Sequence, residues 1–217
     1  MAHGLKIGRK KFIMTLSVVA LLLCAAILIF LFPVRYIDEP YEYPILPQSE
    51  EWKALGSNSE RMASLNIPWH QLRHMTTESL VETIYQYPVF LVHYGITPYP
   101  AEVYSLLKEQ FNALPELESR SDAADALIKA YCAMDVQYTS NPDESFQILF
   151  LEIILGQKIF LEQMSLQQRQ TLLTIATEKL QEEKQVWTGN EMLARHYIGT
   201  FFTAVEKSGF GSEFPRP

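Results

Sequence analysis

The chain has 217 residues, of which 48% are hydrophobic and 20% charged, enough apolar side chains for a folded core and too many for a disordered chain. Its net charge is −7, but four Lys/Arg and no acids precede Arg35, so the rest carries 14 basic against 25 acidic residues, a net of −11. A surface this acidic repels phosphate backbones, which argues against nucleic acid and favours basic peptides or cations, if any specific partner.

Residues 12–32, "FIMTLSVVALLLCAAILIFLF", contain no charged side chain. A helix of this length spans roughly 30 Å, the thickness of a hydrocarbon core. Basic residues precede the run and acidic ones follow it, and this Lys/Arg bias predicts a cytoplasmic N-terminus. We therefore predict a basic cytoplasmic tail at 1–11, a single-pass transmembrane signal-anchor helix at 12–32, and an extracytoplasmic C-terminal domain on the cell membrane.

Two forms of cleavage are alternatives to this anchor. A signal peptide has a shorter apolar region, of about 7–15 residues, and a small-residue cleavage site, which residues 32–34 (FPV) do not offer. Lipoprotein cleavage before Cys24 requires a small residue upstream, where Leu22 and Leu23 stand. Because neither cleavage site has the residues it requires, the sequence favours an uncleaved anchor.

Residues 33–48 hold four prolines, which are spaced too closely for a helix. Two arrangements fit this Pro-rich segment. One is an extended polyproline-like stalk, which at about 3.1 Å per residue would lift the domain about 45–50 Å from the bilayer. The other is an arm that lies over the domain through Tyr36, Tyr41 and Tyr43. In neither arrangement does this segment supply catalytic residues.

From residue 49 on, apolar side chains recur with the 3.6-residue period of helices. In the stretch 75–90, Thr76 precedes the apolar residues and Glu78 falls in the first turn, which is typical of a helix N-terminus. The Tyr87-Pro88 step ends this helix. A nucleophilic threonine needs a base and an oxyanion hole, and the sequence indicates neither. Thr76 is therefore predicted to be an N-cap.

Four further helix starts are signalled by a proline or a capping side chain: Pro100, Ser121, the Asn141-Pro142 step and Ser165. The helix from Pro100 is expected to extend through Phe111 and Leu114. The helix from Pro142 is apolar nearly all round, which is typical of a core centre. With a last helix ending near Gly209, we predict an all-α, orthogonal or superhelical domain over 49–210 and a flexible tail at 211–217.

The histidines His70 and His74 stand four residues apart, the spacing of a zinc-binding pair on a helix. A zinc protease would have glutamate at position 71, where this chain has Gln71, and no third ligand is evident by spacing. Cys132 falls beside Tyr131 on an apolar face, where a thiol is buried and inert rather than paired with His196. We therefore predict no metal, no cofactor and no catalytic residue.

Several charged residues concentrate between two predicted helices: Glu116, Glu118, Arg120, Asp122 and Asp125. Carboxylates near an arginine can perform acid–base chemistry, but such networks also hold helices together. We predict the second role, with Arg120 bridging Glu116 and a carboxylate at the start of the next helix. The calcium-loop pattern, with its invariant glycine, is absent.

Aromatic residues are dense over thirty-one positions: Trp69, Tyr85, Tyr87, Phe90, Tyr94 and Tyr99. Some of them belong to the core. Any that are exposed form an amphipathic patch suited to peptide or glycan contact, because aromatic side chains are enriched at interfaces. The predicted binding patch consists of Trp69, Tyr85, Tyr87, Phe90 and Tyr94.

Two stretches with fixed spacing, "IP..L..MTT..L...T..YP" from Ile67 to Pro88 and "FN...EL..R.DA" from Phe111 to Ala123, resemble a set of uncharacterised exported, membrane-anchored helical proteins of Gram-positive gut bacteria. The resemblance covers about Glu51 to Tyr131. It implies a bacterial, extracytoplasmic helical domain and no activity. Its polar members Thr76, Asn112 and Arg120, like Asp122, are expected to hold turns and helix ends together.

These patterns predict a binding or interaction module with an unidentified protein or peptide partner, rather than an enzyme. The alternative is a cell-envelope hydrolase that uses His70 and His74, or a Glu116–Arg120–Asp125 cluster. A third is a subunit that needs a partner to cover an apolar face. The first two differ in whether polar side chains converge in a cleft.

Overall fold

The structure, a computed structural model, describes Met14 and residues 36–90, 99–134 and 142–186. The chain forms two compact units, Met1–Tyr36 and Ile37–Pro217. The predicted anchor (Met14 apart), the last helix and the tail lie outside the described residues. Within the described ranges, no helix combines the length and the apolar character needed to cross a membrane.

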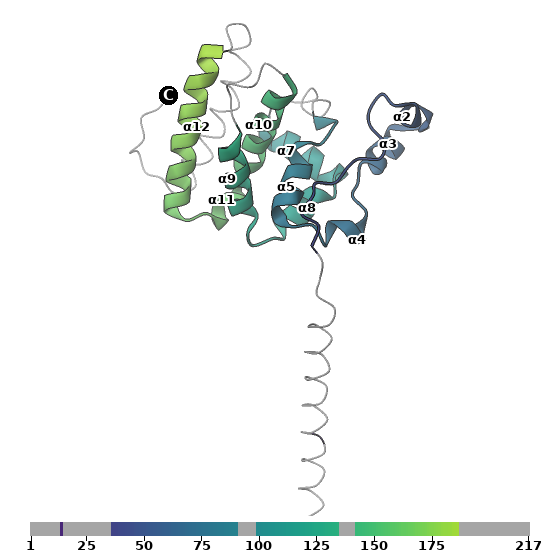
Figure 1. Cartoon of the computed structure of the whole chain (residues 1–217), viewed down its shortest axis with the longest axis horizontal. Coiled ribbons are helices and arrows are strands. Elements are labelled where there is room, and N and C mark those ends of the chain that lie inside the picture. Colours follow the sequence, from purple (N-terminus) through teal and green to yellow (C-terminus); the bar gives the residue numbers. More distant parts are fainter. Residues whose placement is uncertain (1–13, 15–35, 91–98, 135–141, 187–217) are drawn as a thin grey trace, which may run out of the picture. The chain divides into compact units, whose positions relative to one another are not determined.

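All regular elements in the described part of the second unit are helices, which confirms the all-α prediction (Figure 1). In chain order they are α2 (Glu50–Ala54), α3 (Asn58–Ser64), α4 (Trp69–Leu72), α5 (Thr77–Tyr85), α7 (Pro100–Gln110), α8 (Ala113–Glu118), α9 (Ala123–Ala133), α10 (Pro142–Leu155), α11 (Lys158–Gln163) and α12 (Leu166–Val186).

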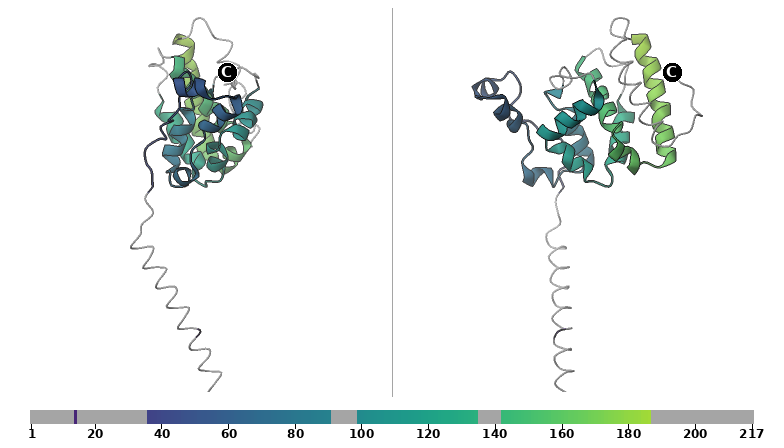
Figure 2. Two further views of the ribbon diagram at one scale, coloured as in Figure 1. Left: turned by 90° about the vertical axis from the view of Figure 1, so that its right-hand side faces the viewer. Right: turned by 180° about the vertical axis from the view of Figure 1, so that it is seen from behind.

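Helix α5 packs against α8, α9 and α10, and α10 also contacts α7, α9 and α11. These helices enclose the core, whereas α2 buries none of its residues. Figure 2 shows α12 and the α2–α3 pair at opposite ends of the unit. The apolar helix predicted from Pro142 is at the core, since Phe150, Leu151 and Ile154 are fully buried.

One predicted helix end is shifted in the structure. The helix that starts at Pro100 ends at Gln110, because the backbone of Phe111 is extended. The side chain of Asn112 accepts a hydrogen bond from Ile67 N at 3.0 Å and donates one to Ile67 O at 2.7 Å, which holds this part of the chain against another segment. Leu114, predicted to continue the same helix, lies in α8.

The predicted cap at Ser121 is wrong, because Asp122 occupies the N-cap of α9. The turn after α8 continues through Arg120, whose backbone amide donates to Leu117 O at 3.1 Å, so the next helix starts later than the hydroxyl pattern indicates. Pro100 and Ser165 open helices as predicted. Ser165 accepts from Gln168 N at 3.2 Å, and its own amide donates to the Gln168 side chain at 2.8 Å.

Residues 37–44, here called the arm, pack on the helical domain. Ile37 N donates to His74 O at 2.7 Å and Thr76 N donates to Ile37 O at 2.9 Å, a short parallel bridge with the Met75 segment. Of the two arrangements predicted for 33–48, the packed arm is therefore the one found from Ile37 on. Tyr36 is 63% exposed, so only Tyr41 and Tyr43 contribute packing.

Candidate functional site

An open pocket of about 380 Å³ lies between the arm and the segment of α4 and Met75. Its walls are mostly apolar, with one carboxylate and one amide. The lining residues are Ile37, Pro40, Tyr41, Glu42, Pro44, Gln71 and Met75. The pocket therefore depends on how firmly the arm is held.

A stripe of hydroxyl groups on α5 holds the arm in place. Thr76, Ser79 and Thr83 follow the i, i+3, i+7 spacing that puts side chains on one helix face. The hydroxyl of Ser79 donates to Ile37 O at 2.7 Å, and that of Thr83 accepts from Tyr41 N at 2.8 Å. Ser79 and Thr83 are almost completely buried, so these bonds are shielded from water.

The arm's tyrosines strengthen the same contact. The Tyr43 hydroxyl donates to Thr83 O at 3.1 Å, and its ring meets those of Tyr41 and Tyr87 edge to face, at 5.3 and 6.3 Å between centroids. Burial raises the pKa of Tyr43 well above its usual range, and it also raises the pKa of Tyr41. Both phenols are therefore neutral at physiological pH.

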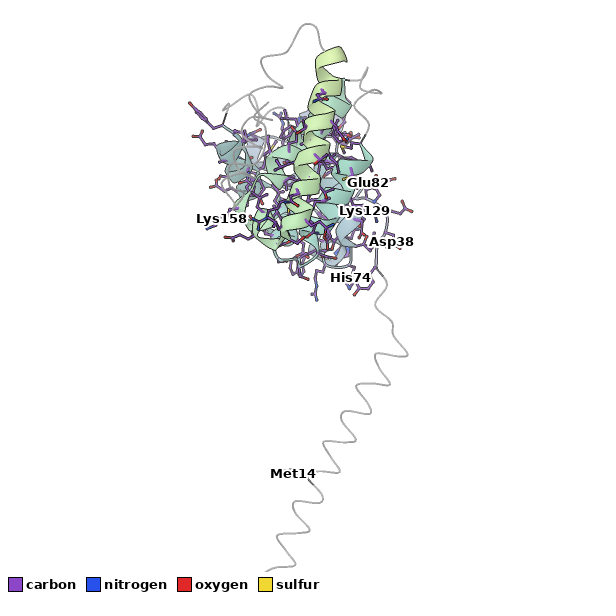
Figure 3. The ribbon with its side chains drawn as sticks, turned by 90° about the vertical axis from the view of Figure 1, so that its left-hand side faces the viewer. Met14, Asp38, His74, Glu82, Lys129 and Lys158 are labelled. Carbon is purple, nitrogen blue, oxygen red and sulfur yellow. The ribbon has the colours of Figure 1, made fainter. Side chains whose placement is uncertain are left out.

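The outer side of the arm is acidic. Asp38, Glu39 and Glu42 are exposed, and none of them forms a hydrogen bond or ion pair with another residue that the structure describes. In Figure 3, Asp38 and His74 are labelled along one edge of the domain, with Lys158 on the opposite side. The pocket thus combines mostly apolar walls with the carboxylate of Glu42, and Asp38 and Glu39 add exposed negative charge to the same arm outside the lining.

The predicted histidine pair does not form a metal centre in the described structure. α4 spans only four residues, and the Nδ1 atom of His74 lies 2.6 Å from the carbonyl oxygen of His70. His70 is exposed. In the described ranges, no group of three or more metal-binding side chains comes together.

Arg120 joins three parts of the chain. Its guanidinium donates to Met75 O at 2.7 Å, to Leu72 O at 3.0 Å and to Glu116 Oε1 at 3.0 Å. The fork geometry of arginine allows these bonds at once. The bridge to Glu116 matches the prediction, but the other partners are the carbonyl oxygens of Leu72 and Met75 and the hydroxyl of Thr77, rather than a carboxylate of the next helix.

The other acids of this segment have separate partners. Asp122 accepts from the Thr77 hydroxyl at 2.9 Å, and Glu118 pairs with Lys108 at 2.6 Å and with the Tyr104 hydroxyl at 2.9 Å. The Asp125 carboxylate accepts from the side chain of Gln168. These carboxylates do not converge, and none lines the pocket.

The predicted aromatic patch is only partly exposed. Tyr87 and Phe90 are 3% and 4% exposed and stack on core phenylalanines, so their assignment to a surface patch is wrong. Their neighbours Phe111 and Phe150 come from distant segments, which a local pattern does not reveal. Trp69, with Arg73 over its ring at 5.6 Å, is exposed and Tyr85 is half-buried. Tyr94 lies outside the described residues.

The sequence patterns missed a buried polar group at α9, α10 and α12. The hydroxyl of Tyr131 donates to Glu152 Oε1 at 2.8 Å, and Lys179 Nζ lies 5.3 Å from the centre of the Tyr131 ring and donates to Met134 O. A signal existed, because Glu152 is the single acid in the apolar run 146–155. A lone acid in such a helix indicates a buried partner.

Cys132 differs from its predicted environment, because it is exposed rather than buried. It follows Tyr131, whose side chain takes the inward position on α9. Partial burial still raises the pKa of the Cys132 thiol, while Lys179 lowers it. His196, the partner considered for a catalytic pair, lies outside the described residues.

No protein-family model, curated protein or solved structure matches this chain. Its function is therefore inferred from the arm, the pocket and the charges described above.

Proposed function

We propose that the protein is a membrane-anchored binding module, displayed outside a bacterial cell and tied to the membrane by residues 12–32. The uncharged run and the basic residues before it support the anchor and its orientation. The net charge of −11 after the run supports a partner that is not a nucleic acid. The partner class that we propose is a protein or peptide.

A short tether follows from the packing of the arm. The arm's contacts begin at Ile37, so only residues 33–36 separate the proposed span from the folded unit. Four residues reach at most about 14 Å when fully extended. The chain between the proposed span and Ile37 is therefore much shorter than the roughly 45–50 Å of a polyproline-like stalk.

The single observation that favours binding over catalysis is the composition of the pocket. Catalysis needs acid, base or nucleophilic groups that converge on one cleft. The candidates for an envelope hydrolase are His70, His74 and the Glu116–Arg120–Asp125 group, and none of them lines the pocket. Arg120 is also saturated by carbonyl oxygens and Glu116. Apolar walls with few polar groups are typical of a recognition site.

Photocrosslinking in the producing cells tests this function. A photoreactive amino acid at Gln71, which lines the pocket, should give a discrete protein adduct on irradiation. The same group at Lys158, an exposed residue away from the pocket, serves as the matched control. Adducts at both sites, or at neither, would count against a partner that binds at the pocket.

A further inference from the structure

We propose that the pocket between the arm and α4 binds an extended basic peptide segment of a partner protein at the same membrane face. This inference rests on the proposed function and adds the chemical class of the partner. It follows from the shape of the pocket, its charge and the way the arm is held.

The pocket is open on one side and can receive a segment of peptide chain. Five of the seven lining residues belong to the arm, between Ile37 and Pro44. Gln71 and Met75 form the facing wall. Prolines and a tyrosine ring give apolar surface for side chains, and the open side leaves room for the peptide backbone to enter and leave.

The negative charge of the arm, with Glu42 in the pocket lining, specifies the partner. Asp38, Glu39 and Glu42 are exposed, form no ion pair among the described residues, and have no basic residue between them in the arm. Lysine or arginine in a bound segment complements them, while acidic segments and anionic lipid headgroups are repelled. Charges at the rim of a site contribute mainly to association rate and to choice of partner.

The arm is ordered before any partner arrives. The hydroxyls of Ser79 and Thr83 bind the arm backbone, and the Tyr43 hydroxyl binds α5 in return. A partner therefore meets a wall that is already formed and does not bear the entropic cost of ordering it. This preorganisation suits a short segment, which buries little surface.

The test uses the full-length protein in phosphatidylcholine nanodiscs and a random heptapeptide library displayed on phage. Peptides that are enriched should combine lysine or arginine with an apolar residue or proline. A selected synthetic peptide should bind about fivefold more weakly to the Glu42→Lys variant, with a weaker dependence on salt. The Glu109→Lys variant makes the same charge change at an exposed position of α7 and should bind like wild type.

The outcomes separate this inference from the proposed function. Enrichment of neutral or acidic peptides, equal binding by Glu42→Lys, or displacement by phosphatidylglycerol vesicles would overturn the basic-peptide inference. The proposed function survives these results if Gln71 still gives its protein adduct in cells. An empty selection together with no adduct at Gln71 would overturn both.

Discussion

The hydroxyl oxygen of Thr83 accepts a hydrogen bond from the backbone amide of Tyr41, 42 residues earlier in the chain, at 2.8 Å. Thr83 is fully buried, and its hydroxyl also donates to Ser79 O at 2.8 Å. The Thr83 hydroxyl is thus used both as a hydrogen-bond acceptor and as a donor. The bond joins the arm to the centre of the helical core and fixes one wall of the pocket.

Thr83→Val should loosen the arm. Valine keeps the shape of threonine but leaves the Tyr41 amide without its acceptor, a loss of about 1–3 kcal/mol in the free energy of unfolding. Hydrogen exchange should also become faster at the Tyr41 amide than in wild type. The unfolding midpoint and the exchange rate can be measured on one sample.

Thr174→Val is the matched control for this change. Thr174 lies exposed on α12 and donates to the carbonyl of Gln170, as Thr83 does to Ser79, but it has no bond to the arm. Its replacement should leave stability within about 0.5 kcal/mol of wild type. If Thr83→Val and Thr174→Val destabilise the protein equally, the bond between Thr83 and the arm does not stabilise it.

Arg120 should be important for stability. Lysine keeps the charge but loses the fork that reaches Leu72 O, Met75 O and Glu116 at once. Arg120→Lys should therefore cost about 1–3 kcal/mol, and Arg120→Met at least as much, because it leaves Glu116 without its guanidinium partner. Arg73→Lys, on the surface, should change the melting temperature little. If both Arg120 variants melt at the same temperature as wild type, these contacts contribute nothing to stability.

The buried hydrogen bond between Tyr131 and Glu152 should contribute more than a similar bond nearer the surface. Tyr131→Phe removes one hydrogen-bond donor from the Glu152 carboxylate, which is only 4% exposed, at a cost of about 1–3 kcal/mol. Tyr104→Phe removes an equivalent donor from Glu118, which retains its ion pair with Lys108. Chemical denaturation should rank Tyr131→Phe as the more damaging; the reverse order would contradict this.

Alkaline pH should destabilise the domain. Burial raises the pKa of Tyr43, Tyr87 and Tyr104 above the ordinary value of 10.0. Above pH 10 the unfolded chain loses these protons while the folded chain retains them, so stability falls as pH rises, by up to about 1.4 kcal/mol per pH unit for each tyrosine. Below pH 10 these tyrosines add no pH dependence to the stability of the domain. Tyr43→Phe should reduce the slope measured by denaturation between pH 9 and 11.5.

Local signals in the sequence predicted the starts of α5, α7, α10 and α12 but not those of the other helices that the structure describes. Thr76 caps α5 and accepts from Ser79 N at 3.3 Å, Pro100 opens α7 and Ser165 precedes α12. Each of these signals acts within one helical turn. Ser121 failed because the preceding turn and the contact between Asp122 and Thr77 determine where α9 begins.

The parts that the sequence could not reveal depend on contacts between distant segments. Period and propensity do not show that Tyr87 stacks on Phe111, or that the hydroxyl face of α5 faces the arm. The pocket was missed for that reason, since its walls come from residues 37–44 and 71–75. The structural role of Arg120 was predictable because Glu116 lies one turn away.

Protease accessibility shows on which side of the membrane the domain lies. Proteinase K added to intact cells that carry a C-terminally tagged full-length protein should remove the tag and leave a small membrane-bound fragment with residues 12–32. A cytoplasmic protein in the same cells should remain intact. Full protection of the tag, or release into the medium of a mature protein that lacks residues 1–32, would contradict the proposed anchored, extracytoplasmic binding module.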